Sequence, residues 1–488
     1  MAVGLVLILG FALRLISLNQ SFWLDEAVQV WASRDFGIKD LLFEYMKGDF
    51  NPPLFHFLLH FWIKIFGDSE VSVRMPSVIL GVGSIWLVYK TAVLLFHLGG
   101  VHANTSKVFW LSALLLATSP LHIYYSQEAR MYSLTCFSVL LMIWRFLIWQ
   151  KKESFKNGLF LGTSLVFMGF SHYLTLLVLP AMLIFIYSKH GRGSVIKKFG
   201  LILLPLILFF LLYLPIFNNQ LKTGIAIKND FSVWGETVGS FSLKSAALLP
   251  IKFIIGRISM SNKIAYGITA AVLVVIFWGI TLLEGAKNLK LKIQNSKLQL
   301  KIQNFNSFLF ALLLFLSPTL GFIVSFFVPV FSYFRFLFVL PFFYLLIGFG
   351  IEKIKKRNLK RLVIIFLVGI NLTCSFIYLF NSKFHREDWK GMVDWLDKQE
   401  KAPLLILSQV SKPLEYYSKS DILFWPQDEE KIKENGKIWL IEYALPIFDP
   451  QKTVKGGLLE QGFVLIEQKS FREIILSFWE KEVYAYRY

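Results

Sequence analysis

The first candidates for chemistry are two adjacent carboxylates, Asp25 and Glu26, in the sequence FWLDEA that follows an apolar N-terminal run. A carboxylate that is partly desolvated at the boundary between membrane and water has a raised pKa, which suits a general base. A simpler interpretation is also open. Asp25 would cap the following helix, AVQVWASRDF, and Glu26 would interact favourably with the helix dipole.

Three arginines, Arg74, Arg130 and Arg335, are expected on the same side of the membrane as these carboxylates. An arginine at the membrane edge is costly unless it meets an anion, and a lipid phosphate is the obvious anion. We therefore predict donor phosphate binding by these arginines. For Arg130 the simpler alternative is a local salt bridge with Glu128.

Further polar residues are expected on this side and are candidates for substrate binding: Asn51, Glu128, Tyr132 and His172. Some have simpler interpretations. Tyr132 fits an interfacial belt of aromatic residues together with Tyr124 and Tyr125, and His172 is equally compatible with a turn between helices. Arg14, near the end of the first apolar run, is expected to snorkel to the surface.

Carboxylates and cations on one side of a membrane match the requirements of sugar transfer from a lipid phosphate. A carboxylate deprotonates the acceptor hydroxyl, the oxygen attacks the anomeric carbon, and cations stabilise the departing phosphate. The sequence contains neither G-x-G-x-x-G nor a Walker motif, which disfavours a nucleotide sugar or ATP as donor.

Metal binding has little support in the sequence. His56 and His60 lie four residues apart, but the segment lacks the glutamate of H-E-x-x-H and a nearby third ligand, so an aromatic-rich interfacial helix is favoured. Asp25 and Glu26 could bind a divalent ion, although two adjacent carboxylates without further ligands make a poor site. We assign no metal site and no firmly implied cofactor.

The elements that position these residues are predicted to be membrane spans. Of the 488 residues, 55% are hydrophobic and 17% are charged, and the mean hydropathy is +0.57, which excludes a purely soluble protein. We count about eleven apolar runs, which predict an all-α polytopic membrane protein. They are 1–18, 75–98, 108–125, 131–149, 158–170, 173–187, 199–217, 264–283, 308–327, 336–351 and 362–380.

The net charge of +19 predicts the orientation of these spans. Alternate loops are rich in Lys and Arg, as expected of a cytoplasmic side, and a nucleic-acid partner is disfavoured because the cations do not cluster on one domain. We expect a multi-pass protein of the cell membrane with a cytoplasmic N-terminus. The basic loops are 151–156, 189–198, 287–301 and 352–361.

Two domains are predicted. Residues 1–380 form the transmembrane domain, whose first outside loop, 19–74, carries the carboxylates. Residues 381–488 begin with a helical pattern and continue with short apolar runs, LLILS, ILFW, IWLIEY and FVLIEQ. This pattern predicts a small extracytoplasmic α/β domain.

The order of three motifs resembles a known family. The motifs LRLISLNQSFWLDEA, NPPLFHFLLHFWIKIFGDSEVSVRMPS and SPLHIYYSQEARMYSL resemble the superfamily of protein mannosyltransferases, aminoarabinose transferases and RgtA-like galacturonosyltransferases, of the glycosyltransferase family 39 type. The resemblance implies the C-type glycosyltransferase fold and a polyprenyl-phosphate sugar donor. It also implies that Asp25 is the catalytic base, that Glu26 helps to hold the acceptor or the base, that Arg74 supports the site, and that Arg130 binds donor phosphate.

We therefore expect a glycosyltransferase that moves a sugar from a polyprenyl-phosphate carrier to a hydroxyl of an envelope glycan, lipid or protein at the outer side of the bilayer. The alternative is a non-catalytic flippase or transporter of lipid-linked sugars. Transporters tend to show paired internal repeats with broken helices, and none is evident here. A membrane scaffold would leave the clustered outside charges unexplained.

Overall fold

The computed structural model describes residues 2–98, 106–190, 200–230, 242–287, 289–294, 297–302 and 305–482. The chain divides into two compact units. The first, called here the helical unit, comprises Met1–Leu18, Phe36–Gly67 and Ser72–Phe384. The second, called the sheet unit, comprises Asn19–Asp35, Asp68–Val71 and His385–Tyr488.

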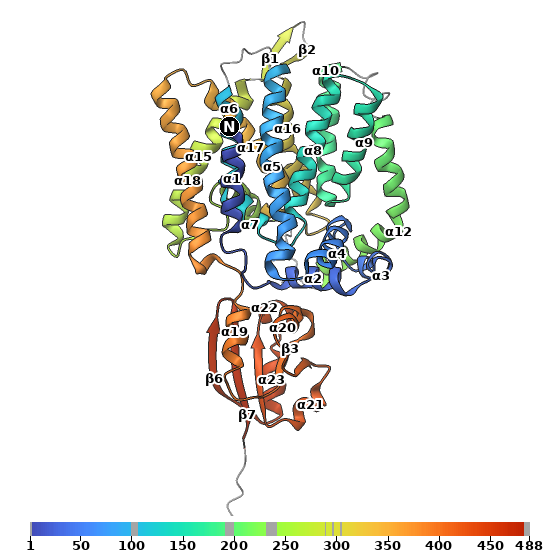
Figure 1. The fold of residues 1–488 in the computed structure, drawn as a ribbon, viewed down its shortest axis with the longest axis vertical. Helices are drawn as coiled ribbons and strands as arrows, with labels where there is room; N and C mark the ends of the chain where they lie inside the picture. The colour runs from blue at the N-terminus through green and yellow to red at the C-terminus, as the bar shows by residue number, and fades with distance from the viewer. Residues whose placement is uncertain are drawn as a thin grey trace, which may run out of the picture. The chain divides into compact units, whose positions relative to one another are not determined.

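Helices make up most of the helical unit (Figure 1). A hairpin of β1 (Leu289–Gln294) and β2 (Lys297–Ile302) lies between α15 and α16 in the chain. The helices are α1 (Ala2–Leu15), α3 (Ile38–Phe43), α4 (Leu54–Phe66), α5 (Glu70–Leu98), α6 (Ser106–Ala117), α7 (Pro120–Ser126), α8 (Tyr132–Lys151), α9 (Phe155–Gly169), α10 (Val178–His190), α12 (Gly200–Asp230), α14 (Leu243–Ile255), α15 (Lys263–Lys287), α16 (Phe305–Val324), α17 (Leu340–Glu352) and α18 (Arg357–Phe380), with short 3-10 turns at Tyr45–Lys47, Tyr173–Leu177, Tyr333–Val339 and Ser382–Phe384.

The described residues of each predicted apolar run are mostly helical. Among the described residues, seven helices are long and apolar enough to cross a bilayer, and three shorter apolar helices accompany them. A multi-pass membrane protein is therefore supported, while the count of eleven crossings stays a prediction. The seven are Glu70–Leu95, Tyr132–Lys151, Ile202–Ala226, Lys263–Thr281, Ser307–Val324, Tyr333–Glu352 and Arg357–Phe380.

One predicted span is two helices. The run 108–125 divides into α6 and α7, because Ser119 has an extended backbone and its hydroxyl accepts a hydrogen bond from the amide of His122. Pro120 occupies the first turn of α7, where its missing N–H costs nothing. This break starts a short, buried helix that leads into the turn carrying Glu128 and Arg130.

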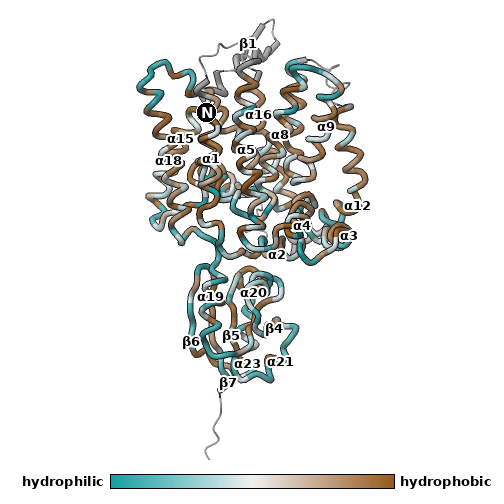
Figure 2. The backbone as a smooth tube through the Cα atoms, viewed as in Figure 1, coloured by the Kyte–Doolittle hydropathy of each residue, from teal (hydrophilic) through white to brown (hydrophobic). Residues whose placement is uncertain are grey.

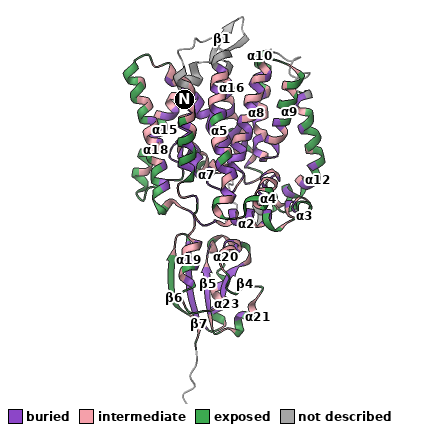
Figure 3. Ribbon diagram, in the orientation of Figure 1, coloured by how far each residue is buried: buried purple, intermediate pink, exposed green. Residues whose placement is uncertain are grey.

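Hydrophobic residues also occur on the exposed outer helices of the helical unit (Figures 2 and 3). Leu212 of α12 and Val275 of α15 are exposed, whereas α17 is buried along most of its length. Exposed apolar faces around a buried centre are what a lipid environment requires. At one end of the unit lie the loops 151–156 and 352–361 with the β1–β2 hairpin, and at the other lie α3 and α4 (Figure 1).

The sheet unit contains a five-stranded sheet in the order β4-β3-β5-β7-β6. β3 pairs in parallel with β4 and β5, while β7 pairs antiparallel with β5 and β6. The strands are β3 (Leu404–Leu407), β4 (Ile422–Trp425), β5 (Lys437–Glu442), β6 (Phe463–Phe471) and β7 (Ile474–Lys481), and the helices are α2 (Leu24–Asp35), α19 (Trp389–Leu396), α20 (Lys412–Tyr417), α21 (Glu429–Glu434), α22 (Leu445–Phe448) and α23 (Thr453–Glu460).

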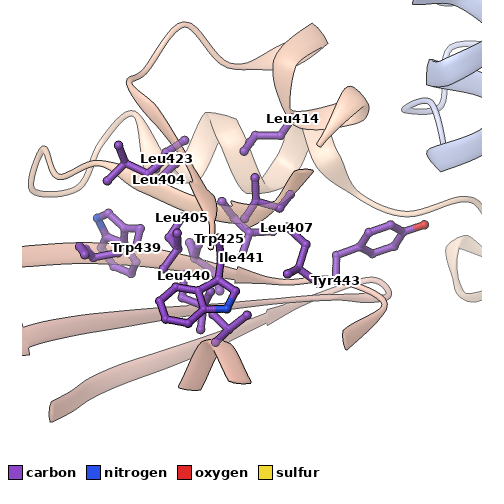
Figure 4. Packing of buried hydrophobic residues seen from close by; sticks show 14 of the residues in the cluster. Leu404, Leu405, Leu407, Leu414, Leu423, Trp425, Trp439, Leu440, Ile441 and Tyr443 are labelled. Atoms are coloured by element: carbon purple, nitrogen blue, oxygen red, sulfur yellow. The ribbon is translucent and has the colours of Figure 1, made fainter. Parts of the chain in front are cut away.

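The core of this unit combines aliphatic strand residues with tryptophans (Figure 4). Leu405 and Leu440 are adjacent in the β3–β5 register, and Trp439 stacks near Phe478 with ring centroids 4.5 Å apart. The segment Asn19–Asp35, which the sequence analysis placed in the transmembrane domain, is part of this unit. The carboxylate pair and the C-terminal sheet therefore fold as one body.

Candidate active site

The two predicted catalytic carboxylates lie in the first turn of α2 in the sheet unit. Asp25 is half-buried, whereas Glu26 is fully buried. The Glu26 Oε2 atom lies 3.6 Å from Nε of Arg386, whose side chain is also buried. The two neighbours thus differ: Asp25 keeps access to solvent, and the charge of Glu26 is balanced inside the protein.

Hydrogen bonds hold the chain before α2 against the C-terminal part of the sheet unit. The Phe22 amide donates to the hydroxyl of Tyr417 at 2.9 Å, and that hydroxyl donates to Glu70 at 2.9 Å. Lys390 forms an ion pair with Glu70 at 2.6 Å. The backbone that carries Asp25 is consequently fixed before the helix begins.

Arg74 was predicted to support the site. It contacts Leu18, the last residue of the helical unit before the segment Asn19–Asp35. Its Nη1 atom donates to the carbonyl oxygen of Leu18 at 2.7 Å, and its side chain is fully buried. Gln127 donates to the carbonyl of Ile16 at 2.6 Å. Together these contacts position the segment that leads to Asp25.

The snorkelling expected for Arg14 is wrong, because this residue is fully buried. Its guanidinium donates to the carbonyl oxygens of Gly10 at 2.6 Å and Ala117 at 3.2 Å, and lies 2.6 Å from Nδ1 of His122. Buried carbonyls of α1 and of the end of α6 thus offer this cation partners within the bundle.

In the helical unit, five charged or titratable residues form what we call the charged cluster: Asp49, His56, Arg130, His172 and Arg335. His56 Nε2 lies 3.1 Å from Asp49 Oδ2. Both the backbone and the side-chain nitrogens of Asn51 donate to Asp49 Oδ1, at 2.8 and 3.0 Å. Burial alone would raise the pKa of Asp49, but His56, Arg130 and the Asn51 amide outweigh it and lower the pKa to about 2.

His172 is fixed at the start of a 3-10 turn, where its Nδ1 atom accepts a hydrogen bond from the Leu174 amide at 3.1 Å. Burial, followed by the charges of Arg335 and Arg130, lowers the pKa of His172 to about 3, against an opposing effect of Asp49. His172 is therefore a neutral imidazole at physiological pH. The structure brings together four predicted site residues here, namely Asn51, Arg130, His172 and Arg335.

Aromatic rings connect this cluster to the remaining predicted residues. The guanidinium of Arg335 lies 5.8 Å from the ring centroid of Phe334, which contacts Tyr132 at 5.4 Å. Tyr132 in turn contacts Tyr125 at 5.0 Å. These tyrosines, together with Tyr124, are buried, so their interpretation as a surface belt is wrong. They line up inside the unit between α7 and α8.

Arg257 is a cation that the sequence analysis missed. It donates to the hydroxyl of Tyr124 at 2.5 Å and lies over the same ring at 4.7 Å. Tyr124 is the largest influence raising the pKa of Arg257, burial opposes it, and Glu128 also contributes, so the predicted residue Glu128 lies in the field of this cation. The signal in the sequence was a single arginine after Gly256 in an unassigned loop.

Asp49 and His56 were also missed as a pair. His56 was considered only as a zinc ligand with His60, yet its partner is a carboxylate seven residues earlier, brought back by the turn at Asn51-Pro52-Pro53. Among the described residues no group of three or more His, Cys, Asp or Glu side chains could hold a metal ion. The guanidinium beside Glu26 also disfavours a divalent cation there, since like charges repel.

The two units carry candidate residues with different chemical capabilities. In the sheet unit, a half-buried carboxylate stands beside a charge-balanced one and could accept a proton. In the helical unit, Arg130, Arg335 and Arg257 could stabilise an anion, and the neutral His172 could form hydrogen bonds without adding charge.

The fold defines a class of protein: a polytopic helical membrane protein with a small α/β domain. Residues 51–217 match the family model "Dolichyl-phosphate-mannose-protein mannosyltransferase". The "Putative mannosyltransferase YycA" of Bacillus subtilis (strain 168) is 28% identical over 160 residues, which are 32% of this chain and 22% of that protein. This chain therefore matches about a fifth of the length of that relative.

Solved structures share the fold over nearly the whole chain. ArnT from Cupriavidus metallidurans bound to undecaprenyl phosphate is 10% identical with a TM-score of 0.60, and the match covers 98% of this chain and 97% of ArnT. The archaeal oligosaccharyltransferase AglB from Archaeoglobus fulgidus is 10% identical with a TM-score of 0.53, covering 98% of this chain and 73% of AglB. Residues 51–217 therefore match a mannosyltransferase family model, and the chain as a whole shares the fold of ArnT and AglB.

Proposed function

We propose that this protein is a membrane glycosyltransferase that moves a sugar from a polyprenyl-phosphate carrier to a hydroxyl of an envelope glycan, lipid or protein. The observation that carries the proposal is the half-buried Asp25 beside the charge-balanced Glu26, in a chain with the family match described above. The lipid donor is supported by relatives of the same fold, since ArnT is bound to undecaprenyl phosphate and AglB is in complex with a dolichol phosphate.

In the proposed reaction, Asp25 takes the proton from the acceptor hydroxyl as its oxygen attacks the anomeric carbon. A bond forms between that oxygen and the anomeric carbon, and the bond from this carbon to the phosphate oxygen breaks. The electron pair of the broken bond leaves with the polyprenyl phosphate, and attack from the opposite side inverts the anomeric configuration. Asp25 then releases its proton to solvent.

Cations of the helical unit stabilise the departing phosphate in this proposal. Arg130 and Arg335 are half-buried members of the charged cluster, and a guanidinium can donate paired hydrogen bonds to a phosphate. Arg257 adds a cation held by Tyr124. Arg74 donates to Leu18, so we propose that it supports the site through the backbone, and its contact with the donor phosphate stays a prediction.

The proposed substrate residues fall in the same part of the helical unit. Asn51 donates twice to Asp49 and thereby shapes the loop before α4. Tyr132 and Glu128 flank the turn that carries Arg130. We propose that these side chains, with His172, contact the sugar or its phosphate at the outer face of the cell membrane, with the N-terminus in the cytoplasm and the basic loops on that side.

The decisive experiment measures transfer of radiolabelled sugar from a polyprenyl-phosphate donor by the purified protein in detergent. We expect Asp25→Asn to reduce transfer by at least about 10³-fold, because an amide cannot accept the proton. Asp40→Asn, an exposed carboxylate of α3, is the matched control and should retain activity. Full activity of a folded Asp25→Asn protein would overturn the proposed base.

The same variants separate transfer from transport. If the protein only moved lipid-linked sugars across the bilayer, vesicles containing Asp25→Asn would still translocate the labelled lipid, and no glycosylated product would form with either protein. We expect instead that the unsubstituted protein forms product and that the Asp25→Asn protein does not.

A further inference from the structure

The buried ion pair of Glu26 and Arg386 indicates what the C-terminal part of the sheet unit contributes. The two residues are 360 positions apart in the chain, yet their side chains are 0% and 1% exposed. Other ion pairs of this unit are more open: both side chains of the Arg34–Asp68 pair are 39% exposed. Of these two ion pairs, only the Glu26–Arg386 pair is buried.

Burial makes the integrity of this pair important. Desolvating two charges is costly, and removing one partner leaves an uncompensated charge in the interior. Such a charge draws in water, shifts the backbone or becomes neutral. Glu26 is adjacent to Asp25 in the first turn of α2. Each of these responses would therefore move the proposed base or change the charge next to it.

Two segments of the sheet unit hold the backbone of Arg386. Its amide donates to Oε1 of Gln20 at 3.0 Å, and its carbonyl oxygen accepts a hydrogen bond from Nε of Arg472, in the turn between β6 and β7. The amide of Asp388 donates to the carbonyl of Arg472 at 3.2 Å. The backbone of Arg386 is therefore tied to the β6–β7 turn as well as to the segment that carries Glu26.

The residue after Arg386 is fixed as well. Tyr443, which follows β5, donates to Oε1 of Glu387 at 3.1 Å. Burial, then Glu387, and to a smaller extent Asp25, raise the pKa of the Tyr443 phenol. Asp25 therefore lies close enough to the end of β5 for its charge to influence Tyr443.

We propose that Arg386 is a positioning residue for the glycosyl transfer: it holds the Glu26 carboxylate in its charged, buried position and thereby fixes Asp25 for proton abstraction. The C-terminal α/β part of the chain thus completes the base end of the site. This inference rests on the proposed function, because it needs Asp25 to be the base.

The test is a double-mutant cycle on the full-length protein, with kcat and the donor KM measured for Glu26→Gln, Arg386→Met and the double variant. If Arg386 acts through Glu26, Arg386→Met alone lowers kcat about 10²-fold with the donor KM within about twofold, and costs at most about threefold more in the Glu26→Gln background. Arg386→Lys, which keeps the charge, should recover part of kcat.

The control is Arg34→Gln, which removes a cation from the exposed ion pair of the same segment and should leave kcat within about twofold. Costs of Glu26→Gln and Arg386→Met that multiply in the double variant would overturn the proposal, as would an unchanged kcat in Arg386→Met. The melting temperatures give a second readout. We expect Arg386→Met to lower Tm and the double variant to melt no lower than it, whereas additive losses contradict the pairing.

These outcomes differ from those that would defeat the proposed function. A protein without transferase activity, or one that stays active as Asp25→Asn, contradicts the assigned reaction, while the Tm cycle can still show that Glu26 and Arg386 are coupled. Multiplicative effects in an active, Asp25-dependent enzyme contradict only the role assigned to Arg386.

Discussion

Charged side chains are held differently in the two units. In the sheet unit, the Glu26 carboxylate is fully buried and meets the guanidinium of Arg386 from the distant C-terminal part of the chain. In the helical unit, the Asp49 carboxylate meets a histidine seven residues away, and two half-buried arginines lie in the same cluster. Glu26 pairs with a guanidinium from a distant segment, whereas Asp49 pairs with a nearby histidine and Arg130 contributes to its low pKa.

This difference suggests a division of labour. A balanced, buried pair gives a rigid frame in which a neighbouring base keeps one position. The guanidinium groups of Arg130 and Arg335 in the charged cluster can attract an incoming anion. In the proposed reaction, the Glu26–Arg386 pair fixes the base that takes the acceptor proton, and the arginines of the charged cluster stabilise the leaving phosphate.

Removing cations from the helical unit tests this division of labour most directly. We expect Arg335→Gln and Arg130→Gln each to raise the donor KM, and the double variant to lower kcat/KM about 10²-fold or more, because charge on the leaving phosphate is less stabilised. Steady-state transfer with varied donor concentration measures this.

The matched control for these variants is Arg145→Gln. Arg145 is a half-buried arginine of the same unit that lies over the rings of Trp144 and Phe160. It should leave the donor KM unchanged. If Arg130→Gln and Arg335→Gln also leave the donor KM unchanged and alter only the amount of folded protein, the proposed role of the cluster in phosphate binding is wrong.

The local pattern of the sequence predicted the helices but not the pairing of charges. Continuous apolar runs such as 362–380 specify a buried or lipid-facing helix by composition alone, and α18 ends at the predicted Phe380. The short apolar runs of the C-terminal part likewise predicted β3 to β6. Strand β7 was missed, and so was the break at Ser119-Pro120, although a capping serine before proline is a recognisable start signal.

Contacts between side chains that are far apart in the chain could not be predicted from the sequence. Nothing in the spacing of Glu26 and Arg386 shows that they meet, because their approach depends on the folding of the whole sheet unit. Arg14 was misjudged for a similar reason: its partners Ala117 and His122 belong to other helices. Adjacent motifs such as Asp25-Glu26 were found, since they need no knowledge of the fold.

A smaller effect is expected when the local pair of the helical unit is removed. Asp49→Asn should lower the free energy of unfolding at neutral pH by about 2–3 kcal/mol, because a charge-assisted hydrogen bond to His56 is lost. Thermal unfolding in detergent measures this. A loss much below that range would show that the pair contributes little to holding the loop before α4.

The pH dependence of this loss gives a second check. The native pKa of Asp49, about 2, is lower than its ordinary value of 3.8, so the ionised form stabilises the folded state. That contribution is complete above about pH 4 and disappears as the pH falls through about 2. Asp49→Asn should therefore lack this acid-dependent component, and an identical acid limb in both proteins would contradict the assignment.

The smallest expected effect concerns His172, the neutral member of the charged cluster. Its native pKa of about 3 is below the ordinary 6.5, so protons bind the unfolded chain first and stability decreases as the pH falls below 6.5. Between pH 7 and pH 5 this group alone should remove about 2 kcal/mol. Melting curves of the unsubstituted protein and of His172→Asn across this range measure the difference.

Asparagine is the informative replacement because its side-chain oxygen can still cap the turn that begins at Tyr173. We expect His172→Asn to flatten the decline in Tm between pH 7 and pH 5 while changing little at pH 7. A decline that persists unchanged would mean that His172 is protonated beside Arg335 and Arg130 in the native protein. The cluster would then carry even more positive charge, and the contrast with the balanced Glu26–Arg386 pair would widen.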